Sequence, residues 1–188
     1  GLPLTILTYK KYQLKWGHFG FKKIRPALAI KESLLGYFLY LGINILISMI
    51  IIYGDLEIPG YQMKENALNL FGNDTLSLII AGIIMVIIAP VVEEVIFRGF
   101  LLSTLINKTG KILGSTLTAM VFAIVHWPME NIIPIFILGL IINGLYIRTG
   151  SIWTTITFHI INNGIAFTLG LLIAKEVISL ESLVISLS

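Results

Sequence analysis

The chain has no cysteine and few charged residues. Only 12% of its 188 residues are Asp, Glu, Lys or Arg, whereas an ordinary soluble domain carries about 25%. Without cysteine there is no disulfide framework, thiol nucleophile or thiolate zinc site. The scarcity of charge argues against a soluble domain. The net charge of +3 does not indicate a nucleic-acid partner, because the basic residues are placed for membrane topology.

Hydrophobic residues are abundant instead: they make up 56% of the chain, and the mean hydropathy is +0.93. Several apolar runs approach the ~20 residues that a helix needs to cross a bilayer. We therefore expect an all-α, polytopic transmembrane helix bundle with at least five spans. The expected spans cover residues 33–53, 76–106, 112–127, 131–147 and 151–174, and a further apolar segment covers 177–188. The second span is longer than a bilayer requires, so we expect Pro90 to kink or divide it.

The placement of basic residues predicts the orientation. Lys and Arg gather before the first span, after the second (Lys108, Lys111) and after the fourth (Arg148), which puts these segments on the cytoplasmic side. We expect residues 1–75 to form the N-terminal basic loop, the first span and an outer loop that carries a short helix near 62–71. Residues 76–174 would form the transmembrane core, and 175–188 a C-terminal apolar segment. We expect a multi-pass bacterial cell-membrane protein without a signal peptide, cut from a longer protein.

Three formal charges interrupt the second span, in the run Glu93-Glu94-Val-Ile-Phe-Arg98. A charged side chain at the bilayer centre costs roughly 2.5–3.5 kcal/mol, so such residues indicate a functional site. Glu94 and Arg98 are four residues apart and share a helical face, which predicts an ion pair. Glu93 points about 100° away and is left as a candidate general base. Alternatively, all three residues hold neighbouring helices together through polar contacts, or they line an ion path.

Two later spans carry further polar side chains. His126 follows Phe122 by one turn, and His159 precedes Asn163 by one turn. Helix counting places Glu93 and His126 about 21–22 Å from the cytoplasmic ends of their spans, Asn163 about 18 Å and His159 about 12 Å. Tilts of about 20° would bring these side chains together. Taken singly, His126 is typical of a membrane interface, and His159 and Asn163 of hydrogen bonds between helices, a role that we also assign to Asn143.

Together, the polar side chains of these three spans support hydrolysis by an activated water molecule. No serine has a placed histidine partner, so a carboxylate with histidine help remains, together with imidazole and amide donors for an oxyanion. Glu93, His126 and His159 are also a legitimate zinc ligand set. The residues alone therefore leave a zinc-dependent mechanism open.

The three motifs, EExxxR, FxxxH and HxxxN, resemble those of the CAAX protease and bacteriocin-processing (Abi) family. All three occur in order on separate expected helices, over about residues 76–174, with no departure at a motif position. The resemblance implies an all-α intramembrane endopeptidase that cleaves a peptide or membrane-protein substrate within the lipid bilayer. By this resemblance Glu93 and His126 activate water, His159 and Asn163 stabilise the oxyanion, and Glu94 and Arg98 organise the site.

The resemblance further implies a metal-free glutamate mechanism without a cofactor, although family members are often labelled metalloproteases. Three alternatives stay open. One is the zinc-dependent protease that uses Glu93, His126 and His159. Another is a non-enzymatic immunity or scaffold protein. The third, a small transporter, ranks last because the sequence has no inverted repeat.

Overall fold

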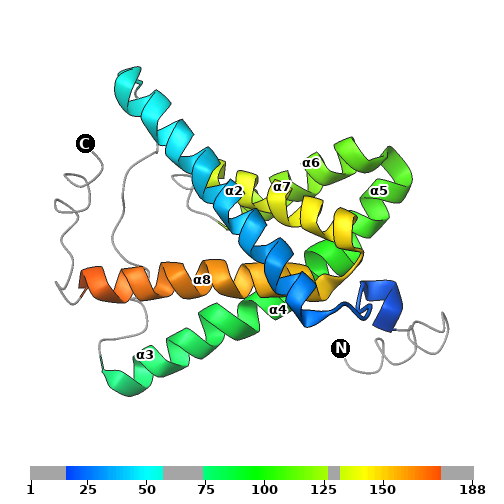
Figure 1. Cartoon of the computed structure of the whole chain (residues 1–188), viewed down its shortest axis with the longest axis horizontal. Helices are drawn as coiled ribbons and strands as arrows, with labels where there is room; N and C mark the ends of the chain where they lie inside the picture. The colour runs from blue at the N-terminus through cyan, green and yellow to red at the C-terminus, as the bar shows by residue number, and fades with distance from the viewer. Residues whose placement is uncertain (1–15, 57–73, 127–131, 175–188) are drawn as a thin grey trace.

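The computed structural model describes residues 16–56, 74–126 and 132–174, and these residues form helices without any strand. The predicted all-α fold is confirmed. Ten helical segments follow one another along the described chain (Figure 1): η1 (Trp16–Phe19), α2 (Pro26–Tyr53), α3 (Thr75–Gly82), η3 (Ile83–Ile88), α4 (Ala89–Glu94), η4 (Val95–Leu102), α5 (Ser103–Thr109), α6 (Lys111–Val125), α7 (Ile132–Thr149) and α8 (Ile152–Ala174). The expected helix at 62–71, the turn at 127–131 and the apolar segment 177–188 lie outside the described residues.

Four helical stretches are long and apolar enough to cross a membrane. They are Pro26–Tyr53, Thr75–Thr109, Ile132–Thr149 and Ile152–Ala174, with 28, 35, 18 and 23 residues. The third expected span, 112–127, corresponds to α6, whose 15 residues extend about 22 Å at the helical rise, less than the four longer stretches. It ends at His126, whose backbone leaves the helical region. This early end places His126 at a helix terminus.

The second of these stretches is one continuous helix whose hydrogen-bond register changes twice. Asp74 caps it, since its side chain accepts a hydrogen bond from the Ser77 backbone N–H at 3.0 Å. Bonds from the Ser77 N–H and hydroxyl hold the pKa of Asp74 below its usual value. Further on, η3 and η4 are π-helical and flank α4, which carries the two glutamates. Such π-helical turns are frequent at functional sites.

Pro90 does not divide this helix. The backbones of Ile88 and Ala89 keep right-handed helical angles, and Ala89 donates to the Ile84 carbonyl five residues earlier. A proline removes one N–H and crowds the carbonyl four residues before it. The π-helical register just before Pro90 accommodates that defect, so the chain continues without a break.

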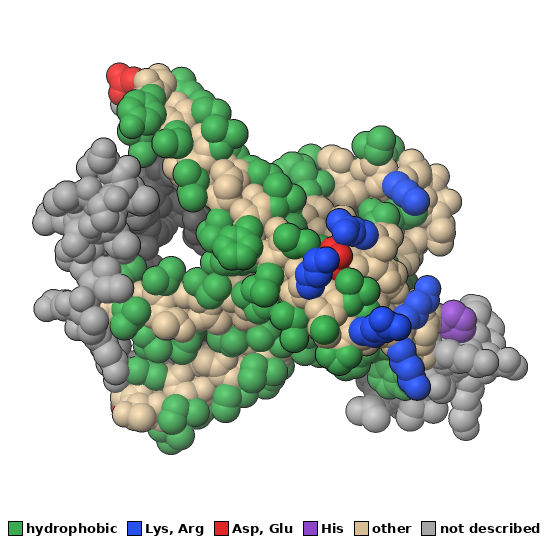
Figure 2. Space-filling model, viewed as in Figure 1, with side chains coloured by type: hydrophobic (Ala, Val, Ile, Leu, Met, Phe, Trp, Pro, Cys, Tyr) green, Lys and Arg blue, Asp and Glu red, His purple; other side chains and the backbone are tan. Residues whose placement is uncertain are grey.

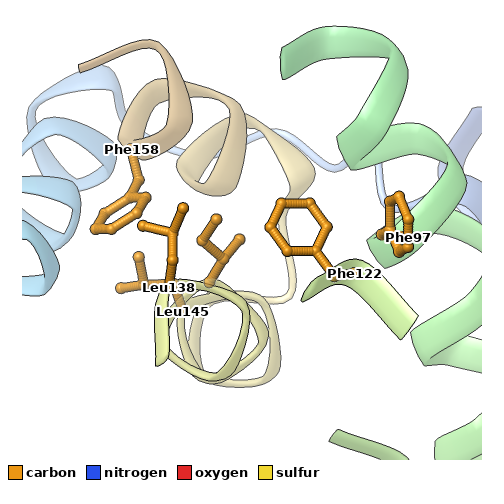
Figure 3. Packing of buried hydrophobic residues seen from close by; sticks show 6 residues of the cluster. Phe97, Phe122, Leu138, Leu145 and Phe158 are labelled. Carbon is orange, nitrogen blue, oxygen red and sulfur yellow. The ribbon is translucent and has the colours of Figure 1, made fainter. Parts of the chain in front are cut away.

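The interior is small and partly polar. Phe97, Phe122 and Phe158 pack with Leu138, Ile142 and Leu145 in a buried cluster (Figure 3). Helices α6 and α7 approach closely where a Cβ on Gly139 would lie only 3.1 Å from the Ala119 Cα. Large apolar side chains cover much of the outer surface (Figure 2). An apolar exterior around polar buried residues is the arrangement expected in lipid.

Candidate active site

Glu93 lies against two histidines from other helices. Its Oε2 is 3.2 Å from His126 Nε2 and 3.7 Å from His159 Nε2. The structure therefore brings together three of the four side chains that were expected to converge, Glu93, His126 and His159 but not Asn163. The Glu93 side chain is 26% exposed, yet Oε2 itself is buried and has no hydrogen-bond partner among the described residues. The 3.2 Å contact has the distance of a hydrogen bond but not its alignment.

Contacts at Nδ1, on the side away from Glu93, fix the orientation of both imidazole rings. His126 Nδ1 lies 2.7 Å from the Phe122 carbonyl oxygen, and His159 Nδ1 lies 2.8 Å from Glu94 Oε1. A carbonyl and a carboxylate accept but do not donate, so each Nδ1 must carry the proton. With Nδ1 protonated, a neutral ring presents the lone pair of Nε2 toward Glu93, and an imidazolium presents an N–H there. The nitrogen that gains or loses a proton in each ring therefore faces this carboxylate.

Glu94 and Arg98 form the predicted ion pair, and both side chains are fully buried, with an Nη1–Oε1 distance of 2.9 Å. Arg98 also donates from Nε to Asn143 Oδ1 at 3.1 Å and from Nη2 to the Gly139 carbonyl at 3.3 Å. Glu94 Oε1 accepts from both Arg98 and His159. The pair therefore connects α4 and η4 to α7 and α8, and it holds His159 in place.

Phe122 occupies the space between these groups. Its ring centroid lies 4.6 Å from the Arg98 guanidinium carbon, 4.3 Å from the His126 ring and 5.9 Å from the His159 ring. Phe97 packs edge-on against the same ring at 4.9 Å. The phenylalanine of the second motif is therefore a spacer that separates the cation from both histidines.

Asn163 lies apart from this cluster. Its Nδ2 donates to the Met85 carbonyl in η3 at 2.9 Å, and its Oδ1 accepts from Asn162 Nδ2 at 3.2 Å. One N–H of the amide group is therefore committed to backbone, and the second is available for another acceptor. Asn163 makes no hydrogen bond with Glu93, His126 or His159 in the described structure.

The matching region of known proteins coincides with the helices that carry this cluster. Residues 75–165, just under half of the chain, match the family model described as type II CAAX prenyl endopeptidase Rce1-like. Over this region the chain is similar to the CAAX protease and bacteriocin-processing family.

A relative from Bacillus subtilis, named putative membrane peptidase YdiL, is 31% identical over 81 residues. The aligned part covers 43% of this chain and 33% of the relative, so the chain matches about a third of that protein's length. No solved structure matches. The similarity to this family thus comes from sequence alone, and the geometry shows how the three motifs lie in this chain.

The motifs of the CAAX protease family do not include Asn143, yet this residue completes the Arg98 environment. Asn143 is fully buried, accepts from Arg98 and donates to the Ser115 carbonyl of α6 at 2.9 Å. The sequence indicated only a hydrogen bond between helices for Asn143. Its position four residues after Gly139, on a face where α7 meets its neighbours closely, was the available signal.

The two histidines and Glu93 converge closely enough to raise the question of a metal ion. Two Nε2 atoms and a carboxylate oxygen, with both rings held through Nδ1, are chemically suited to zinc. Within the part of the chain that the structure describes, however, no group of three or more His, Cys, Asp or Glu side chains has the arrangement needed to hold a metal ion. No step of the mechanism below passes through a metal.

An apolar groove of about 470 Å³ runs between the α3–η3 part of the long helix and α8. Val86, Ile87 and Phe167 are among its lining residues. Val86 follows Met85, the backbone partner of Asn163, so one end of the groove lies close to the third motif.

Proposed function

We propose that this chain is the core of an intramembrane endopeptidase in which Glu93 activates the attacking water. The observation that carries the proposal is the Glu93 Oε2 atom, which is buried without a hydrogen-bond partner and faces Nε2 of both His126 and His159. A carboxylate placed in this way suits a water molecule that must lose a proton.

The chemistry then divides among the residues. Glu93, assisted by His126, takes a proton from water as the oxygen attacks the peptide carbonyl carbon. His159 is stabilised as an imidazolium by Glu94, and it supports the oxyanion together with the second amide N–H of Asn163. The proton held by Glu93 and His126 passes to the leaving nitrogen, the C–N bond breaks, and an acid and an amine are released.

The substrate that we propose is a peptide segment within or beside the membrane. The supporting feature is the groove between α3, η3 and α8, which is apolar and ends near Asn163. We place the protein in a bacterial cell membrane, as its relative from Bacillus subtilis suggests. The oligomeric state forms no part of the proposal.

The test is the Glu93→Gln substitution in the purified full chain, reconstituted in lipid nanodiscs and assayed with a mixture of internally quenched peptides. General base catalysis contributes about 10²–10⁴-fold, so we expect at least a hundredfold loss of cleavage rate. Glu32→Gln is the matched control, because Glu32 is also buried but pairs with Arg148 outside the site. Cleavage by Glu93→Gln at the wild-type rate would overturn the proposal.

The zinc-dependent mechanism is the second candidate, because Glu93, His126 and His159 are ligand types that zinc accepts, although their arrangement in the described structure is not one that holds a metal ion. It predicts one zinc per chain and loss of activity after chelation, with recovery when zinc is returned. Full activity in a preparation verified to be metal-free would exclude it and leave the glutamate mechanism.

A further inference from the structure

The segment before α2, residues 16–25, folds back across the ends of the helices that carry the site, and we call it the strap. Its backbone is tied to the α7–α8 junction: the Gly20 carbonyl accepts from the Ile152 N–H at 2.8 Å, and the Lys22 carbonyl accepts from the Ser151 hydroxyl at 2.7 Å. A Cβ on Gly99 would lie 2.9 Å from the Phe19 carbonyl oxygen, so the strap also touches η4. The strap is therefore a fixed part of the fold.

Three aromatic rings meet at this place. Trp16 packs edge-on against Phe21 at 5.4 Å, and Phe21 packs edge-on against Trp153 of α8 at 5.5 Å. Trp16 and Trp153 remain 69% and 49% exposed. Tryptophan is enriched at the level of lipid headgroups, because its ring is apolar and its N–H is polar. The trio therefore marks the depth at which the strap meets the bilayer surface.

Exposed cations lie beside the aromatic trio. Lys22, Lys23 and Arg25 of the strap and Lys31 of α2 are exposed, and none of them pairs with a carboxylate of the described residues. Arg148 lies on the same face and is paired with Glu32 at 3.1 Å. Figure 2 shows the Lys and Arg side chains gathered on this end of the molecule, whereas the rest of the visible face is largely apolar.

We propose that the strap binds the headgroups of acidic phospholipids. The positive-inside rule accounts for basic residues on this side of the membrane, but not for their gathering on an ordered segment next to exposed tryptophans. The strap lies where α2 and α8 begin, at the ends of two membrane-spanning helices. Acidic lipid is the polyanion that is always present at this depth, and clusters of Lys and Arg beside membrane helices attract it.

The experiment uses quenching of tryptophan fluorescence by brominated lipid. The full chain carries Trp127→Phe, so that emission comes from Trp16 and Trp153, and it is reconstituted in phosphatidylcholine bilayers. Brominated phosphatidylglycerol or brominated phosphatidylcholine is then added in increasing mole fraction. We expect half-quenching by brominated phosphatidylglycerol at a mole fraction at least about threefold lower than by brominated phosphatidylcholine, since the acidic lipid is enriched around the strap.

Two variants separate the strap from general charge. The triple variant Lys22→Gln, Lys23→Gln, Arg25→Gln should lose this preference, whereas Lys108→Gln, Lys111→Gln should keep it, because those two exposed lysines lie on the α5–α6 turn. Raising the salt to 1 M, where the Debye length is about 3 Å, should abolish the preference in the unmodified strap without any substitution. Equal quenching by both lipids, or an equal loss in both variants, would overturn the proposal.

Discussion

Breaking the buried Glu94–Arg98 pair should destabilise the protein strongly, and removing both charges should cost less than the two single changes together. Arg98 makes three hydrogen bonds with fully buried surroundings, and Glu94 Oε1 accepts from two donors. Arg98→Met leaves the Glu94 charge with His159 alone. Glu94→Gln leaves the guanidinium charge without a counter-charge in direct contact.

The expected magnitude follows from burial. Removing one partner of a buried ion pair costs about 3–5 kcal/mol, because the remaining charge is uncompensated. In the double variant, Glu94→Gln with Arg98→Met, no charge is left unpaired. We therefore expect the double variant to cost no more than either single variant, which corresponds to a coupling energy of about 3 kcal/mol or more.

The assay is reversible unfolding of the full chain by SDS in mixed micelles, followed by tryptophan fluorescence. The Glu32–Arg148 pair supplies the control, since it has a similar distance of 3.1 Å but its arginine side chain is 69% exposed. Arg148→Met should cost less than about 1 kcal/mol, as exposed pairs do. Single substitutions at Glu94 and Arg98 that cost less than about 1 kcal/mol, or that add without coupling, would refute the reasoning.

Two further predictions use the same unfolding assay. Asn143→Ala should cost about 1–3 kcal/mol, because it leaves the buried Arg98 Nε without a partner and removes a bond to the Ser115 carbonyl of another helix. Asn44→Ala removes only a bond to the carbonyl of its own helix and should cost less, so an equal cost would contradict the role assigned to Asn143. Thr154→Val should leave stability unchanged or raise it by up to about 1 kcal/mol, because the buried Thr154 hydroxyl has no partner in the described structure. Thr155→Val instead removes a bond to the Ile152 carbonyl and should destabilise, so the opposite ranking would show that the Thr154 hydroxyl is satisfied.

Local spacing made some features of the site predictable. Glu94 and Arg98 are one helical turn apart, so their pairing follows from the geometry of a single helix. The same geometry leaves Glu93 on another face. The all-α membrane fold follows from composition and from the length of the apolar runs.

Contacts between helices were harder to predict from the sequence. Helix counting placed His159 about 9 Å nearer to the cytoplasm than Glu93, yet the two side chains lie 3.7 Å apart. Helix tilt, the early end of α6 and the two π-helical segments are not encoded in residue spacing. The expectation that Glu93, His126 and His159 converge therefore rested on an assumed helix tilt of about 20°, not on the counted depths. The Asn143–Arg98 bond joins different helices, and the sequence indicated only that Asn143 would bond to another helix, not which residue it would meet.

The pairing of Glu94 with Arg98 within one helix also matters while the protein is being made. The long helix enters the membrane before α7 and α8, and His159 follows Glu94 by 65 residues. A lone charge waiting at the bilayer centre would cost roughly 2.5–3.5 kcal/mol. Because the ion pair needs only one turn of its own helix, Glu94 and Arg98 neutralise each other before the later helices are synthesised. The order of residues along the chain thus allows its most polar helix to remain in the lipid until the partners that complete the site are synthesised.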